Sequence, residues 1–103
     1  MFITPTKKNY QNKYLIRQSA SIKTKIFPSS NTVKIFLKEL DEFISLDNVA
    51  FDIWQLLRQK ILFEDLVKKL KNEYRVPEKK LEKDVVQFLA ELEKYQLIKV
   101  SAN

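Results

Sequence analysis

Hydrophobic and polar residues follow one period before residue 47 and a different one after it. In the stretch 21–27 (SIKTKIF), two isoleucines and a threonine alternate with lysines. A period of two is typical of a strand with one buried face, and the stretch 32–37 (TVKIFL) repeats this period. Residues 28–31 (PSSN) supply a turn between them, and residues 43–46 (FISL) indicate a short third strand. The first half of the chain therefore predicts an antiparallel meander.

After residue 47 the apolar residues recur with the period of an α-helix. Asp47 is placed as the N-cap of the first helix, where a carboxylate accepts bonds from free amides of the first turn. Pro77 is expected to start the third helix, because the first helical position tolerates a missing amide hydrogen. Trp54 falls within the first apolar stripe, which favours a core position over a stacking role. The residues expected on the three buried faces are Val49, Ala50, Ile53, Trp54 and Leu57, then Phe63, Leu66, Val67, Leu70 and Tyr74, then Leu81, Val85, Phe88, Leu89, Leu92 and Tyr95.

Three strands followed by three helices predict an α+β domain. We expect a winged-helix-like fold in which a three-stranded antiparallel sheet is followed by three helices. Residues 97–100 (LIKV) suggest a short terminal strand. Residues 1–13 carry a proline, asparagines and lysines without a sustained period, so we expect a flexible N-terminal arm there and one domain over residues 14–103. A length of 103 residues suits a single domain.

The composition excludes several kinds of active site. The chain has no cysteine, no histidine and no glycine. Thiolate nucleophiles, zinc–cysteine sites, histidine general bases and glycine-rich phosphate loops are therefore impossible. A pair of carboxylates remains available in principle, but no spacing singles one out. We therefore expect no enzymatic activity, no cofactor and no metal.

Positive charge is concentrated in the first part of the chain. The formal net charge is +6, and residues 1–40 hold eight lysines or arginines against one acidic residue, whereas residues 41–103 hold eleven against twelve. A basic segment attracts nucleic acid, a membrane surface or an acidic peptide, although it also simply favours solubility. No apolar run is long enough to span a membrane, and the N-terminus lacks the pattern of a secretory signal. We therefore expect a cytoplasmic protein.

An ordered series of short motifs runs from the third strand to the end of the chain. In order, these are Leu46-Asp47, Ala50, Ile53-Trp54, Leu66, Leu70, Tyr74, Val76-Pro77, the run Asp84-Val85-Val86-Gln87-Phe88-Leu89-Ala90-Glu91-Leu92, and Leu97-Ile98. With this series, the stretch from Phe43 to Ile98 resembles the PqqD-like proteins, also called RiPP precursor peptide recognition elements. Two positions depart from the family pattern. Asp47 replaces the usual asparagine, and Gln96 stands where a glycine normally ends the third helix, so we expect that helix terminus to be arranged differently.

The resemblance implies a function. Members of this family bind the leader segment of a ribosomally synthesised precursor peptide and present it to a modifying enzyme, such as a radical-SAM protein, a cyclase or a leader protease. The leader adds as a strand to the edge of the third strand and lies against the third helix. In this chain that edge is Glu42-Phe43-Ile44-Ser45-Leu46. The resemblance therefore predicts a stand-alone peptide chaperone of natural product biosynthesis.

The third helix predicts a second part of the site. On a wheel of about 100° per residue, Leu89 and Val86 widen the apolar arc of this helix to roughly 160°, whereas core packing needs about 100°. We therefore expect Val86 and Leu89 to form an exposed apolar shoulder that holds leader side chains. Lys79 and Lys83 lie just beyond this shoulder and are expected to meet acidic leader residues. An ordinary packing edge remains the alternative interpretation of the wide arc.

Two other functions remain open from the sequence. A winged helix that binds nucleic acid is compatible with the net charge and the three helices. However, the third helix begins Pro77-Glu78-Lys79-Lys80-Leu81-Glu82 and lacks the arginine that a recognition helix commonly uses. The other alternative is a docking subunit that joins a maturation enzyme and has no affinity of its own for a leader peptide.

Overall fold

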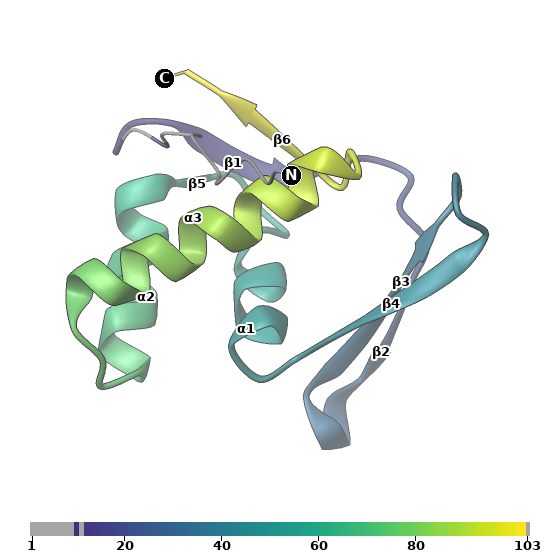
Figure 1. Ribbon diagram of the computed structural model, residues 1–103, viewed down its shortest axis with the longest axis horizontal. Coiled ribbons are helices and arrows are strands. Elements are labelled where there is room, and N and C mark those ends of the chain that lie inside the picture. Colours follow the sequence, from purple (N-terminus) through teal and green to yellow (C-terminus); the bar gives the residue numbers. More distant parts are fainter. Residues whose placement is uncertain (1–9, 11, 103) are drawn as a thin grey trace, which may run out of the picture.

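The computed structural model describes residue 10 and residues 12–102, and it contains two small antiparallel sheets with three helices packed against them (Figure 1). The elements in chain order are β1 (Leu15–Gln18), β2 (Thr24–Phe27), a single 3₁₀ turn (Pro28–Ser30), β3 (Thr32–Leu37), β4 (Glu42–Asp47), α1 (Asn48–Leu56), β5 (Ile61–Leu62), α2 (Phe63–Glu73), α3 (Glu78–Lys94) and β6 (Ile98–Ser101). The predicted α+β class with three helices is confirmed.

The predicted meander forms the sheet β2-β3-β4, in which both pairs of neighbours are antiparallel. Its inner face packs on the helices because alternate residues of β3, namely Val33, Ile35 and Leu37, are buried. The two turns of the sheet use residues with positive φ, Asn31 at 49° and Asp41 at 50°. Asparagine and aspartate tolerate this region better than other non-glycine residues, so the chain can turn tightly without any glycine.

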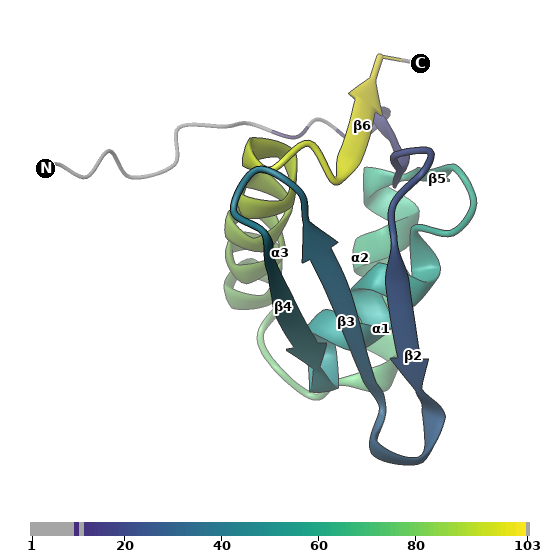
Figure 2. The same cartoon turned by 90° about the vertical axis from the view of Figure 1, so that its right-hand side faces the viewer.

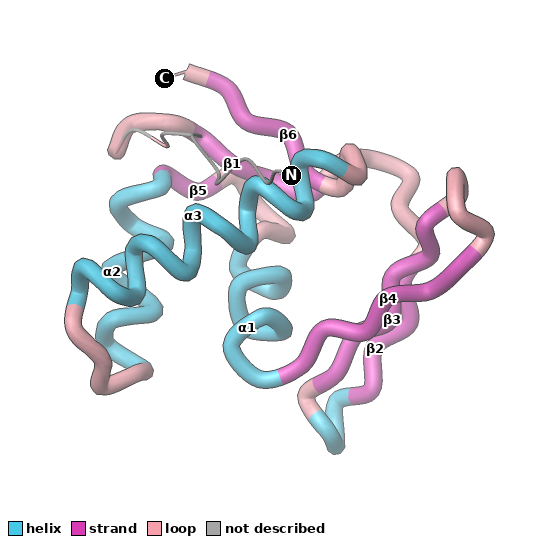
Figure 3. The backbone as a smooth tube through the Cα atoms, viewed as in Figure 1, coloured by secondary structure: helices cyan, strands magenta, loops and turns pink. Residues whose placement is uncertain are grey.

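A second sheet, β5-β1-β6, was not predicted and brings the two ends of the described chain together (Figure 3). The central strand β1 pairs with β5, where Leu15 lies opposite Leu62, and with β6, where Ile16 lies opposite Val100. Ile16 is fully buried. The terminal strand expected near residues 97–100 is confirmed as β6.

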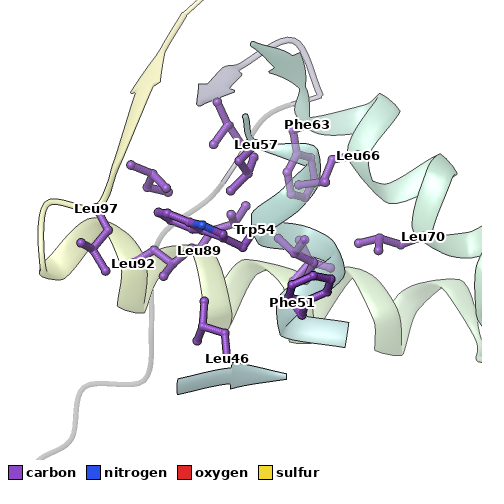
Figure 4. Packing of buried hydrophobic residues seen from close by; sticks show 14 of the residues in the cluster. Leu46, Phe51, Trp54, Leu57, Phe63, Leu66, Leu70, Leu89, Leu92 and Leu97 are labelled. Carbon is purple, nitrogen blue, oxygen red and sulfur yellow. The ribbon is translucent and has the colours of Figure 1, made fainter. Parts of the chain in front are cut away.

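The three helices bury the faces that their periodicity predicts. Trp54 is 1% exposed and lies at the centre of the cluster, between residues of α1 and α3 (Figure 4). The other fully or nearly fully buried helix residues include Ile53, Leu57, Phe63, Leu66, Leu70, Leu81, Val85, Leu89 and Leu92. Tyr74, Phe88 and Tyr95 are only half-buried at the edges of this core. The prediction that Trp54 is a core residue is therefore confirmed.

Asp47 does not cap α1 with its side chain. It occupies the N-cap position, but its carboxylate makes no capping hydrogen bond. Asp47 is still the last residue of β4 and lies opposite Thr32, so its side chain follows the alternation of the strand onto the exposed outer face of the sheet. The chain then enters the helix through Asn48, whose φ is 53°.

The C-terminal end of α3 has the backbone geometry of a glycine C-cap, although the residue at that position is Gln96. Its φ is 60°, its backbone N–H donates to the carbonyl of Glu93, and the N–H of Leu97 donates to that of Leu92, both at 2.9 Å. This pair of bonds is a Schellman motif. The prediction of a different arrangement is therefore wrong, because buried Leu92 and Leu97 hold the turn in place.

Part of the expected N-terminal arm packs on the domain. Residues 1–9 and 11 lie outside the residues that the structure describes. Tyr10 is 8% exposed and Lys13 pairs with Glu64 at 2.6 Å. The carbonyls of Asn12 and Tyr14 accept the backbone N–H groups of Glu64 and Phe63. Residues 12 and 14 thus satisfy free backbone amides at the start of α2. Tyr10 and Lys13 already contact the domain, although the domain was expected to begin only at residue 14.

Candidate functional site

Strand β4 is an edge strand. One side pairs with β3 along the whole strand, and within the described residues no strand pairs with the other side. Figure 2 shows β4 at the margin of its sheet on the side of α3. An unpaired strand edge exposes a row of backbone donors and acceptors and is a template for a further strand.

The register shows which residues of β4 present their backbone groups to the open side. The N–H of Phe36 donates to the carbonyl of Lys23 at 3.0 Å, so it points toward β2 and away from β4. Phe36 lies opposite Phe43, which makes these two residues a non-hydrogen-bonded pair of the β3–β4 ladder. By alternation along β4, the N–H and C=O groups of Phe43 and Ser45 face the open edge.

The side chains of β4 alternate between the two faces of the sheet. Leu46 is 8% exposed and points toward Leu89 and Leu92 of α3 (Figure 4), and Ile44 is half-buried on the same inner face. Phe43 is on the outer face and is 61% exposed. The strand is thus anchored through its inner side chains while its backbone edge remains accessible, as expected from the sequence.

An apolar hollow of about 270 Å³ lies next to the end of β4. It lies between the start of α1, the link from α2 to α3, and the first half of α3. Its lining residues are Val49, Ala50, Ile53, Tyr74, Val76, Leu81, Asp84, Val85 and Phe88. Since β4 leads directly into α1, whose residues Val49, Ala50 and Ile53 line the hollow, the hollow borders the end of the β4 edge.

Tyr74 forms a fixed wall of the hollow. Its hydroxyl donates a hydrogen bond to Oδ2 of Asp52 on α1, which ties the end of α2 to α1. This hydrogen bond, followed by burial and by the negative charge of Asp52, raises the pKa of Tyr74 to about 12. The hydroxyl therefore stays protonated and keeps its donor role throughout the neutral range.

A second hollow, also about 270 Å³, lies at the other end of α3. Tyr95 and Leu97 supply its apolar part, the exposed Lys23 and Lys38 supply positive charge, and Glu39 adds one negative charge. Phe36 and Leu37 of β3 complete the wall toward the sheet. These two lysines lie just before β2 and just after β3, and Lys94 of α3 adds a third ammonium group 5.5 Å from the ring of Tyr95.

The predicted shoulder on α3 faces away from β4. Leu89 is fully buried and offers no surface. Val86 is half-buried, but it points about 160° away from Phe88 around the helix. Its neighbour on the helix surface, Glu82, lines a hollow shared with α2, and Glu93 accepts a hydrogen bond from Tyr10. The Val86 side of α3 is therefore the side that covers α2 and the N-terminal segment.

The lysines expected beside this shoulder also lie outside the groove. Lys79 and Lys83 are exposed on the Val86 side of the helix. On the groove side, Asp84 is exposed and pairs with Lys80 at 3.5 Å. The helical wheel gives the width of the apolar arc, but the sequence contains no signal for which edge of the arc faces the sheet. Phe88, assigned to the core by its period, lines the apolar hollow next to β4.

Neither a metal centre nor a membrane-spanning helix is found in the described part of the chain. Residues 10 and 12–102 contain no group of three or more acidic side chains that could hold a metal ion. Over the same residues, no helix is both long and apolar enough to cross a bilayer.

Comparisons with known proteins give one family and one related structure. The family model described as coenzyme PQQ synthesis protein D (PqqD) matches residues 31–98. The solved structure titled "TbiB1 in Complex with the TbiA(beta) Leader Peptide" is 24% identical, with a TM-score of 0.72 over 84% of this chain and 99% of that chain. No curated protein matches this chain. The matched residues begin just before β3 and include β4, all three helices and the first residue of β6.

Proposed function

The chain belongs to the PqqD family, and from this membership we propose that it binds the leader segment of a ribosomally synthesised precursor peptide. The observation that carries the proposal is the open edge of β4 beside an apolar hollow. The similar fold of TbiB1, whose structure holds a leader peptide, supports it.

The leader binds by strand addition. Its backbone pairs with the N–H and C=O groups of Phe43 and Ser45, and these main-chain bonds supply affinity that depends little on the leader sequence. Alternate leader side chains point to the inner side of the extended sheet. There they enter the hollow beside Phe88 and Val49, and this contact selects apolar leader residues. Acidic leader residues meet Lys23 and Lys38 at the far hollow.

The protein acts by presenting its ligand and not by chemistry of its own. The bound leader is held for a peptide-modifying enzyme, such as a radical-SAM protein, a cyclase or a leader protease. The precursor is made on ribosomes, so a cytoplasmic location forms part of this proposal. The composition includes neither the cysteine nor the histidine that most nucleophile–base pairs use.

The test measures fluorescence polarisation of a labelled leader peptide, taken from the precursor gene beside the gene of this chain. We expect a Kd below about 100 µM, which corresponds to roughly −5.5 kcal/mol. Ser45→Pro removes an edge amide without touching the ladder to β3, and we expect it to weaken binding about tenfold or more. Ser45→Ala keeps that amide and is the matched control.

Two results would count against the proposal. One is the absence of leader binding at 100 µM by a chain whose circular dichroism shows it to be folded. The other is equal affinity of Ser45→Pro and Ser45→Ala, because strand addition requires the amide of residue 45. Labelled duplex DNA serves as a further probe, and affinity for it that falls steeply with salt would favour a nucleic-acid ligand.

A further inference from the structure

The outer face of the sheet β2-β3-β4 is uncovered. Helices pack on its inner face only, and Figure 2 shows no other described element in front of its outer face. By the strand alternation and the register, this face carries Phe27, Phe36 and Phe43 together with Lys23, Lys25 and Lys34. The only acidic residue that the three strands add to it is Asp47.

Exposed apolar surface is concentrated on this sheet. Among the described residues, the exposed large hydrophobic side chains are Ile26, Leu40 and Phe43. Phe43 is on the outer face and Leu40 is in the β3–β4 turn, whereas Ile26 lies opposite Val33 and so points to the inner side. Phe43 is the most exposed of them at 61% and contacts Phe36 with ring centroids 5.1 Å apart. Clustered exposed aromatic residues of this kind mark interaction surfaces more often than a single exposed residue does.

The ring geometry favours a protein partner over nucleic acid. The ammonium groups of Lys25 and Lys34 already lie over the ring of Phe27, at 5.5 and 6.0 Å. The rings of Phe36 and Phe43 are tilted by 56° against each other. Bases stack on flat, open ring faces, and this arrangement offers no parallel pair of them. Tilted rings bordered by cations suit an apolar side chain surrounded by carboxylates.

We propose that this face docks the enzyme that modifies the bound peptide, through an apolar contact at Phe36 and Phe43 and acidic residues that meet Lys25 and Lys34. The proposal rests on the proposed function, since it names the surface used by that partner. Phe43 joins the two sites, because its side chain lies on the docking face while its backbone borders the peptide edge. An enzyme held here therefore lies beside the bound leader.

The test uses the purified peptide-modifying enzyme whose gene neighbours that of this chain, with binding measured by biolayer interferometry. Two double variants remove the apolar and the charged parts separately, Phe36→Thr with Phe43→Thr and Lys25→Glu with Lys34→Glu. We expect each to weaken enzyme binding at least tenfold. The lysine variant, whose two residues line neither hollow of the peptide site, should leave leader binding, measured by polarisation, within twofold. Lys60→Glu with Lys69→Glu reverses two exposed lysines elsewhere and is expected to leave enzyme binding unchanged.

Each other outcome has a defined meaning. Enzyme affinity within twofold of the wild type in both double variants overturns the docking surface, as does the absence of enzyme binding by the wild type. Loss of leader affinity in the lysine variant also overturns it, because the face then belongs to the peptide site. If the wild type binds the enzyme but no leader, the proposed function fails while the docking surface stands. Binding of a labelled dT12 oligonucleotide that the lysine variant abolishes assigns the face to nucleic acid instead.

Discussion

The hydroxyl of Tyr10 donates a hydrogen bond to Oε1 of Glu93 at 2.6 Å, although the two residues are 83 positions apart in the sequence. The ring of Tyr10 stacks on Phe63, with centroids 6.0 Å apart and planes 20° from parallel. Burial, followed by the bond to Glu93 and its charge, raises the pKa of Tyr10 above its ordinary value of 10. A single side chain thus connects the N-terminal segment to both α2 and α3.

Replacing Tyr10 separates the hydrogen bond from the ring contact. Tyr10→Phe keeps the stacking on Phe63 and loses the bond, so we expect the free energy of unfolding to fall by about 1 kcal/mol. Tyr10→Ala loses both, and we expect a fall of about 3 kcal/mol. Urea unfolding followed by the fluorescence of Trp54 measures both values. Wild-type stability of Tyr10→Ala would mean that this segment is not packed on the domain in solution.

Gln96→Gly is expected to stabilise the protein. Gln96 has a φ of 60°, a region that disfavours residues with a Cβ atom by roughly 1–2 kcal/mol, whereas glycine enters it freely. Part of this gain is offset by the larger entropy of glycine in the unfolded chain, so we expect a net increase of about 0.5–1 kcal/mol. Gln96→Ala keeps the Cβ atom and should give no such increase. The melting temperatures of the wild type, Gln96→Gly and Gln96→Ala, measured by thermal unfolding, test this prediction.

The bond between Tyr74 and Asp52 makes stability depend on pH in the alkaline range. The pKa of Tyr74 is raised from 10 to about 12, so the folded state favours the neutral phenol more than the unfolded state does. This contribution is fully present below pH 10 and is lost as the pH rises toward 12. We expect wild type to be more stable than Tyr74→Phe at pH 8 and the difference to shrink between pH 10 and 12. A difference that does not change with pH would contradict this role of Tyr74.

Two half-buried residues of α3 distinguish the groove from the opposite side of the helix. Phe88 lines the hollow beside β4, whereas Val86 points toward α2 and the N-terminal segment. We expect Phe88→Ala to weaken leader binding about tenfold or more and Val86→Ala to change it less than twofold. Fluorescence polarisation measures both, and thermal unfolding checks that each variant is folded. The reverse result would restore the shoulder expected from the helical wheel as the binding surface.

Local patterns determined the elements that could be predicted from the sequence. The alternation of Val33, Ile35 and Leu37 in β3 identified a strand with one buried face, and the burial of these residues agrees. The same alternation identified β2 as a strand, but its Ile26 is 43% exposed and β2 has no buried residue. The helical period around Trp54 identified a core face for the same reason. These signals lie within ten to fifteen residues, where periodicity alone carries the information.

The remaining features depend on contacts between distant residues. Strand β5 has only two residues, and β1 is recognisable only through its pairing with β5 and β6, so neither shows a period. The side of α3 that faces the sheet could not be predicted, because a helical wheel shows which residues are apolar but not which neighbouring element covers each edge. The conformation of Gln96 was misjudged because burial of Leu92 and Leu97 outweighs the residue's own backbone preference.

The pairing of β1 with β6 sets an order of events during synthesis. Residues of β1 leave the ribosome early, yet their partner strand, in which Val100 lies opposite Ile16, follows only after all three helices have been made. The neighbouring sheet is different, because β2, β3 and β4 are joined by short turns and pair as soon as they emerge. A nascent chain therefore exposes a formed β4 edge while its helical body is still incomplete, and this is the stage at which aggregation through that edge must be avoided.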